Sequence, residues 1–173
     1  MVIETVEQAE DLKQKICQTA EDAYEQLKAI SRTNSALEFL FQMKFSKIGF
    51  DPIEGTELNI IEQINQLFSD LVVVEALHDL LSKYPGKRFK LHLGSESGFD
   101  IESMDGEVAA ECFAVTSSDS NRKLKMDSVK LMKKALHQKK YIYFYSQNDV
   151  EYKLENIYKQ FPDITYVRIA KLI

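Results

Sequence analysis

Apolar residues recur every three or four positions through three long stretches of the first half of the chain, with charged residues between them. This spacing predicts amphipathic helices, which we expect at residues 5–30, 35–47 and 58–84. The second is predicted to end at Gly49, and the loop after it contains Pro52, which biases the preceding residue away from helical backbone. The chain is therefore expected to open with two helices that pack on a larger unit, followed by a long helix laid against a sheet.

The second half changes to the two-residue alternation of β-strands. Strands are predicted at residues 87–93, 99–103 and 107–116, followed by a basic amphipathic helix that begins near Leu124. Residues 140–146, KYIYFYS, form an apolar aromatic run typical of a central strand. A helix at 150–161 and a strand at 164–172 complete the chain. The pattern predicts an α/β fold with an N-terminal helical extension at 1–50 and an α/β core at 51–173.

A hairpin lies at the centre of this pattern, because Asp105-Gly106 is the kind of dipeptide that closes a two-residue type I′ turn. With that turn, Asp100 faces Glu111 across the strand pair, and their Cβ atoms lie roughly 5 Å apart. Two carboxylates so placed repel each other unless positive charge lies between them. A divalent cation with oxygen ligands would supply it, so the hairpin suggests a metal site.

The same hairpin also fits an ordinary antiparallel pair with one face in water. In that interpretation the acids are solvating residues, and the carboxylate face also carries Glu102 and Glu107. In either interpretation the opposite face is apolar and carries Phe99, Ile101, Val108, Ala110 and Cys112.

A third acid is suggested by the helix at 58–84. Asn59, Glu62 and Gln66 share one face of it, and Glu62 or Gln66 is a candidate to lean toward the carboxylate pair. The alternative is that these residues form a solvent-facing stripe.

Composition and charge limit the function classes. A chain of 173 residues that is 45% hydrophobic can bury one sizeable core, and a net charge of −5 argues against a protein that coats nucleic acid indiscriminately. Residues 122–140 nevertheless carry eight lysines and arginines against Asp127 alone, which suits either a phosphate-binding surface or a solvated helix face.

No apolar run approaches the roughly 20 residues of a membrane span, and a cytoplasmic protein is expected. Cys17 and Cys112 are expected to be small buried residues.

The order helix, three-strand meander, helix, strand, with Asp on the second strand and Glu on the third, resembles the αβββαβ core of the PD-(D/E)xK, or restriction-endonuclease-like, superfamily. The resemblance covers about residues 58–146 and implies a mixed central sheet. It also implies that Asp100 and Glu111 bind Mg²⁺ or Mn²⁺ and that Glu62 is the helix acid. The family's lysine, two residues after the Glu, is replaced here by Phe113. Lys123 is the first candidate for a migrated lysine, and Lys125 is the second.

The resemblance implies metal-assisted hydrolysis of phosphodiester bonds in nucleic acid, with DNA the first expectation. Lys123 would orient the attacking water, and the phosphates would lie on the basic segment that contains Asn121, Arg122, Lys125 and Lys130. Ser95 and Ser97 precede Asp100 and are either turn residues or neighbours of the site.

An alternative from a different class is a catalytically inactive nuclease-like module that binds nucleic acid or a protein partner. Phe113 in place of lysine and the acidic overall charge favour it. The N-terminal helices carry Phe39, Phe41 and Phe45, which suit a homodimer interface or a lid.

Overall fold

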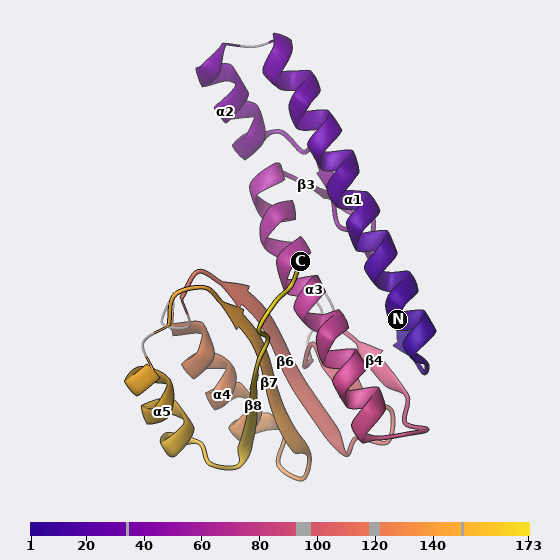
Figure 1. The fold of residues 1–173 in the computed structure, drawn as a ribbon, viewed down its shortest axis with the longest axis vertical. Helices are drawn as coiled ribbons and strands as arrows, with labels where there is room; N and C mark the ends of the chain where they lie inside the picture. Colours follow the sequence, from indigo (N-terminus) through magenta and orange to yellow (C-terminus); the bar gives the residue numbers. More distant parts are fainter. Residues whose placement is uncertain (34, 93–97, 118–121, 150) are drawn as a thin grey trace.

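The computed structural model describes residues 1–33, 35–92, 98–117, 122–149 and 151–173. Within them the chain forms an α/β fold with a mixed six-stranded sheet (Figure 1). In chain order the elements are β1 (Val2–Ile3), α1 (Val6–Thr33), α2 (Ala36–Phe45), β2 (Gly49–Phe50), β3 (Glu57–Leu58), α3 (Ile60–Lys83), β4 (Phe89–Leu91), β5 (Ile101–Ser103), β6 (Val108–Val115), α4 (Lys123–Lys134), β7 (Lys139–Ser146), α5 (Glu151–Gln160) and β8 (Ile164–Arg168).

The main sheet has the strand order β1-β4-β5-β6-β7-β8. Strands β4, β5 and β6 form an antiparallel meander, and β7 and β8 continue the sheet in parallel. Helices α4 and α5 provide the two crossover connections that parallel neighbours require. The prediction that residues 140–146 form a central strand is confirmed, because β7 lies between β6 and β8.

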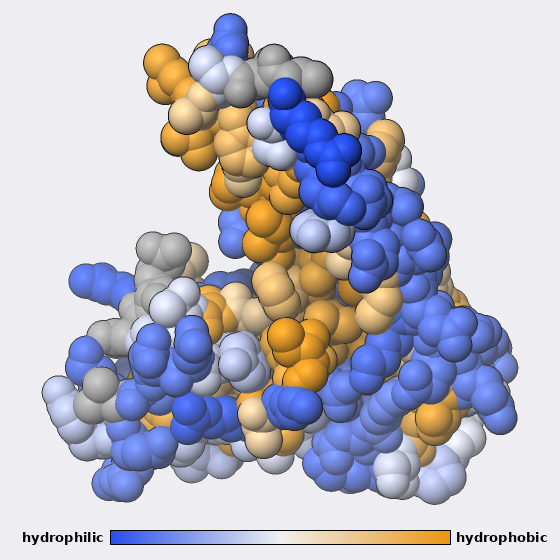
Figure 2. All heavy atoms as spheres, turned by 45° about the horizontal axis from the view of Figure 1, so that its top comes forward, coloured by the Kyte–Doolittle hydropathy of each residue, from blue (hydrophilic) through white to orange (hydrophobic). Residues whose placement is uncertain are grey.

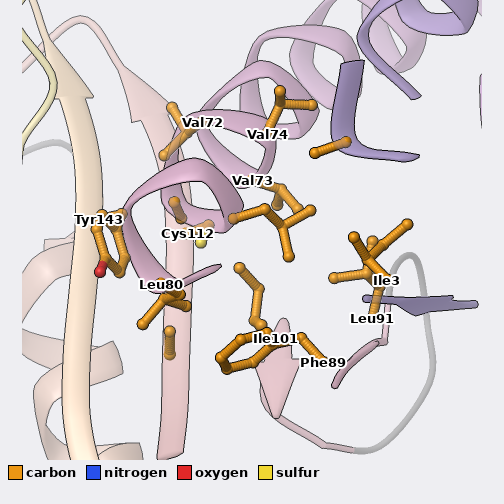
Figure 3. Packing of buried hydrophobic residues seen from close by; sticks show 14 of the residues in the cluster. Ile3, Val72, Val73, Val74, Leu80, Phe89, Leu91, Ile101, Cys112 and Tyr143 are labelled. Atoms are coloured by element: carbon orange, nitrogen blue, oxygen red, sulfur yellow. The ribbon is translucent and has the colours of Figure 1, made fainter. Parts of the chain in front are cut away.

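Helices cover both faces of this sheet (Figure 1). Helices α1 and α3 enclose the larger core, in which Val72, Val73 and Val74 meet Phe89 and Ile101 from the meander (Figure 3). Helices α4 and α5 enclose the second core on the other face, around Phe113, Leu131, Phe144 and Leu154. Side chains along a strand alternate between these two cores, so the face of each residue on β6 decides which helices it meets.

The first residues of the chain belong to the main sheet and its core. Strand β1 pairs with β4, and Ala9, Leu12 and Ile16 of α1 are buried against α3. Beyond them, the second half of α1, helix α2 and the first half of α3 project past the sheet (Figure 1). We call this projection, residues 17–68, the arm.

The sequence pattern did not predict the shortest strands. Strands β1, β2 and β3 have two residues each, which is too few for a two-residue alternation to be recognised. No helix within the described ranges is both long and apolar enough to cross a membrane.

Candidate functional site

The β5–β6 hairpin has the predicted register. Ile101 pairs with Ala110 and Glu102 with Ala109, so Asp100 lies opposite Glu111. The predicted type I′ turn is wrong, because Gly106 has a φ of 71° while Asp105 does not have positive φ. Instead the Gly106 N–H donates to the Ser103 carbonyl at 2.8 Å, and the Ser103 hydroxyl accepts from the N–H groups of Glu107 and Val108 at 3.0 and 2.9 Å.

Helix α4 covers the carboxylate face of this hairpin, so the expectation of a wet face is wrong at the pair. Glu111 is 1% exposed and lies on the same side of β6 as Ala109 and Phe113, which pack beneath α4. Ile101, Val108, Ala110 and Cys112 face α3 as predicted. Phe99 was predicted to join them but packs in the α4 core.

Asp100 is held by the backbone of the neighbouring strand. Its Oδ2 accepts from the Cys112 N–H at 2.7 Å, and the Glu111 side chain lies opposite it across the strand pair. Burial raises the pKa of Asp100, while the Cys112 N–H, the Lys123 and Lys130 amines and the Glu111 side chain oppose the increase. Two buried carboxyl groups placed so close together favour a state in which one of them is protonated.

Glu111 also contacts an amine. Its Oε1 lies 2.5 Å from Nζ of Lys130, a contact that is an ion pair without an aligned hydrogen bond. Burial and the charge of Asp100 raise the pKa of Glu111, and Lys130 lowers it. The net result is a pKa of about 8. Because burial and the charge of Asp100 outweigh the effect of Lys130, Glu111 favours its protonated form at neutral pH.

Lys123 and Lys130 reach the pair from one face of α4. They are seven positions apart, which places them two helical turns apart on the same side, with Asp127 between them. Lys123 lies 3.0 Å from the buried carboxylate of Asp127 and 5.8 Å from the centre of the Phe113 ring. Lys123, the expected substitute lysine, therefore lies beside Phe113, and a second amine, Lys130, contacts Glu111 directly.

Asp70 is the α3 acid whose pKa is affected by Asp100 of the pair, and the expected acid lies elsewhere on the helix. Glu62 is in the capping box of α3, where its side chain accepts from the Asn59 N–H at 3.1 Å. Asp70 lies two turns further along, is 1% exposed and has an Oδ2 atom without a hydrogen-bond partner. Burial raises the pKa of Asp70 to about 7, and nearby Asp51 and Asp100 add to the increase. The feature of the sequence that points to Asp70 is Gln66, one helical turn before it. The Gln66 side-chain amide donates a hydrogen bond to Asp70 at 2.9 Å.

The other basic candidates lie on the outer face of α4. Arg122 and Lys125 line an open groove of about 440 Å³ together with Met126, Val129, Lys133 and Lys134. Lys130 also lines this groove, but its amine turns inward to Glu111. Asn121, Ser95 and Ser97 lie outside the described residues.

The donor set restricts which metal the pair suits. The described ranges contain no group of three or more histidine, cysteine, aspartate or glutamate side chains arranged to hold a metal ion. Mg²⁺ commonly binds to one or two protein carboxylates and completes its octahedron with water and substrate oxygens. Asp100 and Glu111 fit that requirement, whereas the closed four-ligand site of a structural zinc does not fit.

Comparisons with known proteins do not add a family or a neighbour. No family model matches the chain, and neither the curated proteins nor the solved structures include a significant match.

Proposed function

We propose that the chain is a metal-dependent phosphodiesterase with a PD-(D/E)xK-like core that acts on nucleic acid. The observation that carries this proposal is the buried pair Asp100 and Glu111, opposed across β5 and β6 and flanked by two lysines of α4. The element order supports it, because α3, β4, β5, β6, α4 and β7 follow the αβββαβ order of the family.

Asp100 and Glu111 are the residues that would hold Mg²⁺ or Mn²⁺. When bound, such an ion polarises a phosphoryl oxygen and lowers the pKa of a coordinated water. The raised pKa values of the two acids suit this role, because a bound divalent cation would favour the charged form of both carboxylates.

The two lysines have different roles in this proposal. Lys130 contacts Glu111 while the site is free and holds that side chain in place. Lys123 is 41% exposed at its side chain, so its amine remains accessible to a water molecule or a phosphoryl oxygen. Lys123 is therefore the residue expected to orient the attacking water, and Asp127 holds its amine in position.

The basic residues around the outer groove of α4 would contact the flanking phosphates. The groove itself is lined almost entirely by apolar atoms, so these contacts would come from the charged ends of Arg122, Lys125, Lys133 and Lys134 at its rim. Contacts of this kind are independent of base sequence and weaken as salt concentration rises.

A second candidate function is a nucleic-acid-binding module without catalysis. Phe113 favours this function, because a phenylalanine has no charge with which to assist a hydroxide. Its ring is instead buried beneath α4 and stacks on Phe144, with 5.7 Å between the ring centres. In this case Lys130 and Lys123 are the permanent counter-charges of the acids.

Cleavage assays separate the two functions. Single- and double-stranded DNA and RNA are incubated with the protein and Mg²⁺ or Mn²⁺, alongside Asp100→Asn, Glu111→Gln and Lys123→Ala. Glu62→Gln is the matched control, because glutamine preserves the capping box. The phosphodiesterase proposal expects at least a 100-fold loss in the first three variants and an unchanged rate in the control. Activity that survives Asp100→Asn refutes it, and salt-sensitive binding without cleavage supports the second function.

A further inference from the structure

Helix α2 is a capped helix with an apolar outer face. The Ser35 hydroxyl accepts from the Glu38 N–H, and the Glu38 carboxylate accepts from the Ser35 N–H at 2.9 Å, so the first turn is fixed. The helix nevertheless has no buried residue, although most of its sequence, ALEFLFQMKF, is apolar. Leu37, Phe41 and Phe45 are 78%, 60% and 63% exposed, and Leu40 is 59% exposed. These four side chains lie at positions i, i+3, i+4 and i+8 of the helix, so they form one stripe.

The apolar surface continues beyond α2. Ile61, Ile64 and Phe68 on the first half of α3 are also exposed, and hydrophobic residues extend from α2 along α3 on this side of the arm (Figure 2). Together the seven side chains expose on the order of 700 Å². That area exceeds the roughly 300–600 Å² of the largest patch on a typical monomer and approaches the roughly 800 Å² per partner of a stable interface.

We propose that this surface binds a second copy of the chain, with the two α2 helices antiparallel about a twofold axis at Phe41. In that arrangement position i of one copy faces position 82 − i of the other. Leu37 therefore packs against Phe45 of the second copy, and the two Phe41 side chains pack against each other at the axis. The same register places Glu38 opposite Lys44 of the second copy, twice per dimer. Lys44 belongs to the exposed stripe, and its amine lies 5.6 Å from the Phe45 ring.

The charges select this orientation and this partner. A parallel pair would place Glu38 against Glu38 and Lys44 against Lys44, whereas the antiparallel pair neutralises both residues and opposes the two helix dipoles. A self-complementary patch with one acid and one base at equal distances from its centre is what a twofold interface requires.

Sedimentation velocity tests the proposal first. The full chain at about 50 µM is expected to sediment as a dimer, and Phe41→Glu is expected to weaken dimerisation at least 100-fold because two carboxylates meet at the axis. Met126→Glu is the matched control, because Met126 is an equally exposed apolar residue at 62% but lies on α4. Circular dichroism confirms that both variants are folded. A monomeric wild-type chain, or a Phe41→Glu variant that remains dimeric, overturns the proposal.

Disulfide trapping then tests the register. Cys17 is exposed and is replaced by alanine, whereas Cys112 is buried. In that background Phe41→Cys is expected to cross-link to itself on oxidation, and Leu37→Cys to cross-link only when mixed with Phe45→Cys. Self-linkage of Leu37→Cys or of Phe45→Cys indicates a parallel pair and contradicts the proposed arrangement.

Discussion

Nζ of Lys130 lies 2.5 Å from Oε1 of Glu111, and this contact joins the basic helix α4 to the strand that carries the second acid of the pair. Glu111 is almost fully buried, whereas the Lys130 side chain is still 31% exposed. The protein therefore compensates a buried carboxyl group with an amine that extends in from the surface. This arrangement supplies positive charge to the pair while the other carboxyl group, that of Asp100, accepts a hydrogen bond from the Cys112 N–H.

Replacing Lys130 with methionine is expected to destabilise the fold. Methionine preserves much of the stem but leaves Glu111 without its counter-charge, so we expect a loss of about 2–3 kcal/mol at pH 9. The loss is smaller than the ~3–5 kcal/mol of a fully buried pair because the amine is partly solvated. Urea denaturation measures it, and Lys134→Met, an exposed position on the same helix, is the control. Equal stability of the two variants at pH 9 would contradict the assigned role.

The main elements were predictable because their sequence periods are long and local. The 24 residues of α3 and the eight residues of β6 and of β7 each show a clear pattern, and the register followed from the position of Asp105 and Gly106. The turn itself was not predictable from the dipeptide, because the Ser103 hydroxyl, three residues before Gly106, provides the hydrogen bonds that close it.

The site was predictable only in part, because its environment comes from segments far apart in the chain. Asp100 and Glu111 could be paired by counting residues, but burial by α4 and the contact with Lys130 depend on how a later helix packs. The polar face of α3 predicts Glu62 as the helix acid, but Asn59 and Glu62 on that face form the cap of the helix. The sequence signal for Asp70, Gln66 one turn before it, was weak, because the burial of Asp70 arises from tertiary packing.

The raised pKa of Glu111 predicts a pH dependence of stability. The ordinary value is 4.5 and the folded value is about 8, so the folded protein keeps a proton that the unfolded chain loses. Stability is therefore expected to fall as pH rises from about 4.5 to about 8, by a few kcal/mol in total, and to level off above that range. Glu111→Gln removes this contribution. Urea midpoints at pH 5, 6.5 and 8 measure it, and an unchanged slope in Glu111→Gln would refute the assignment.

Asp70 is expected to make stability depend on pH over a lower range than Glu111 does. Its pKa rises from 3.8 to about 7, so its contribution to stability also decreases with increasing pH, and the decrease is complete near pH 7. Asp70→Asn keeps the acceptor for the Gln66 amide and removes a buried charge, so we expect a gain of about 1–3 kcal/mol at pH 8 and little change at pH 4. Thermal or urea unfolding at the two pH values measures the difference. A variant that is less stable than the wild type at pH 8 would show that the Asp70 carboxylate has a compensating partner.

Ser103 is expected to determine the stability of the hairpin that opposes the two acids. Its hydroxyl accepts two backbone hydrogen bonds and donates to Asp105 at 2.7 Å, and the residue is 3% exposed. Ser103→Ala leaves the N–H groups of Glu107 and Val108 without this acceptor, and the buried Val108 N–H cannot turn to water. We expect a loss of about 1–3 kcal/mol. Ser69→Ala is the matched control, because the Ser69 hydroxyl bonds only to the preceding turn of its own exposed helix face.

Hydrogen exchange locates the effect of Ser103→Ala. Faster exchange is expected at the amides of Val108 and Cys112, because the second of these donates to Asp100 and depends on the same register. If the global stability falls while these two amides keep their wild-type protection relative to the rest of the sheet, the hydroxyl supports the core and not the turn. Loss of protection confined to residues 107–112 would link the turn directly to the position of Asp100 opposite Glu111.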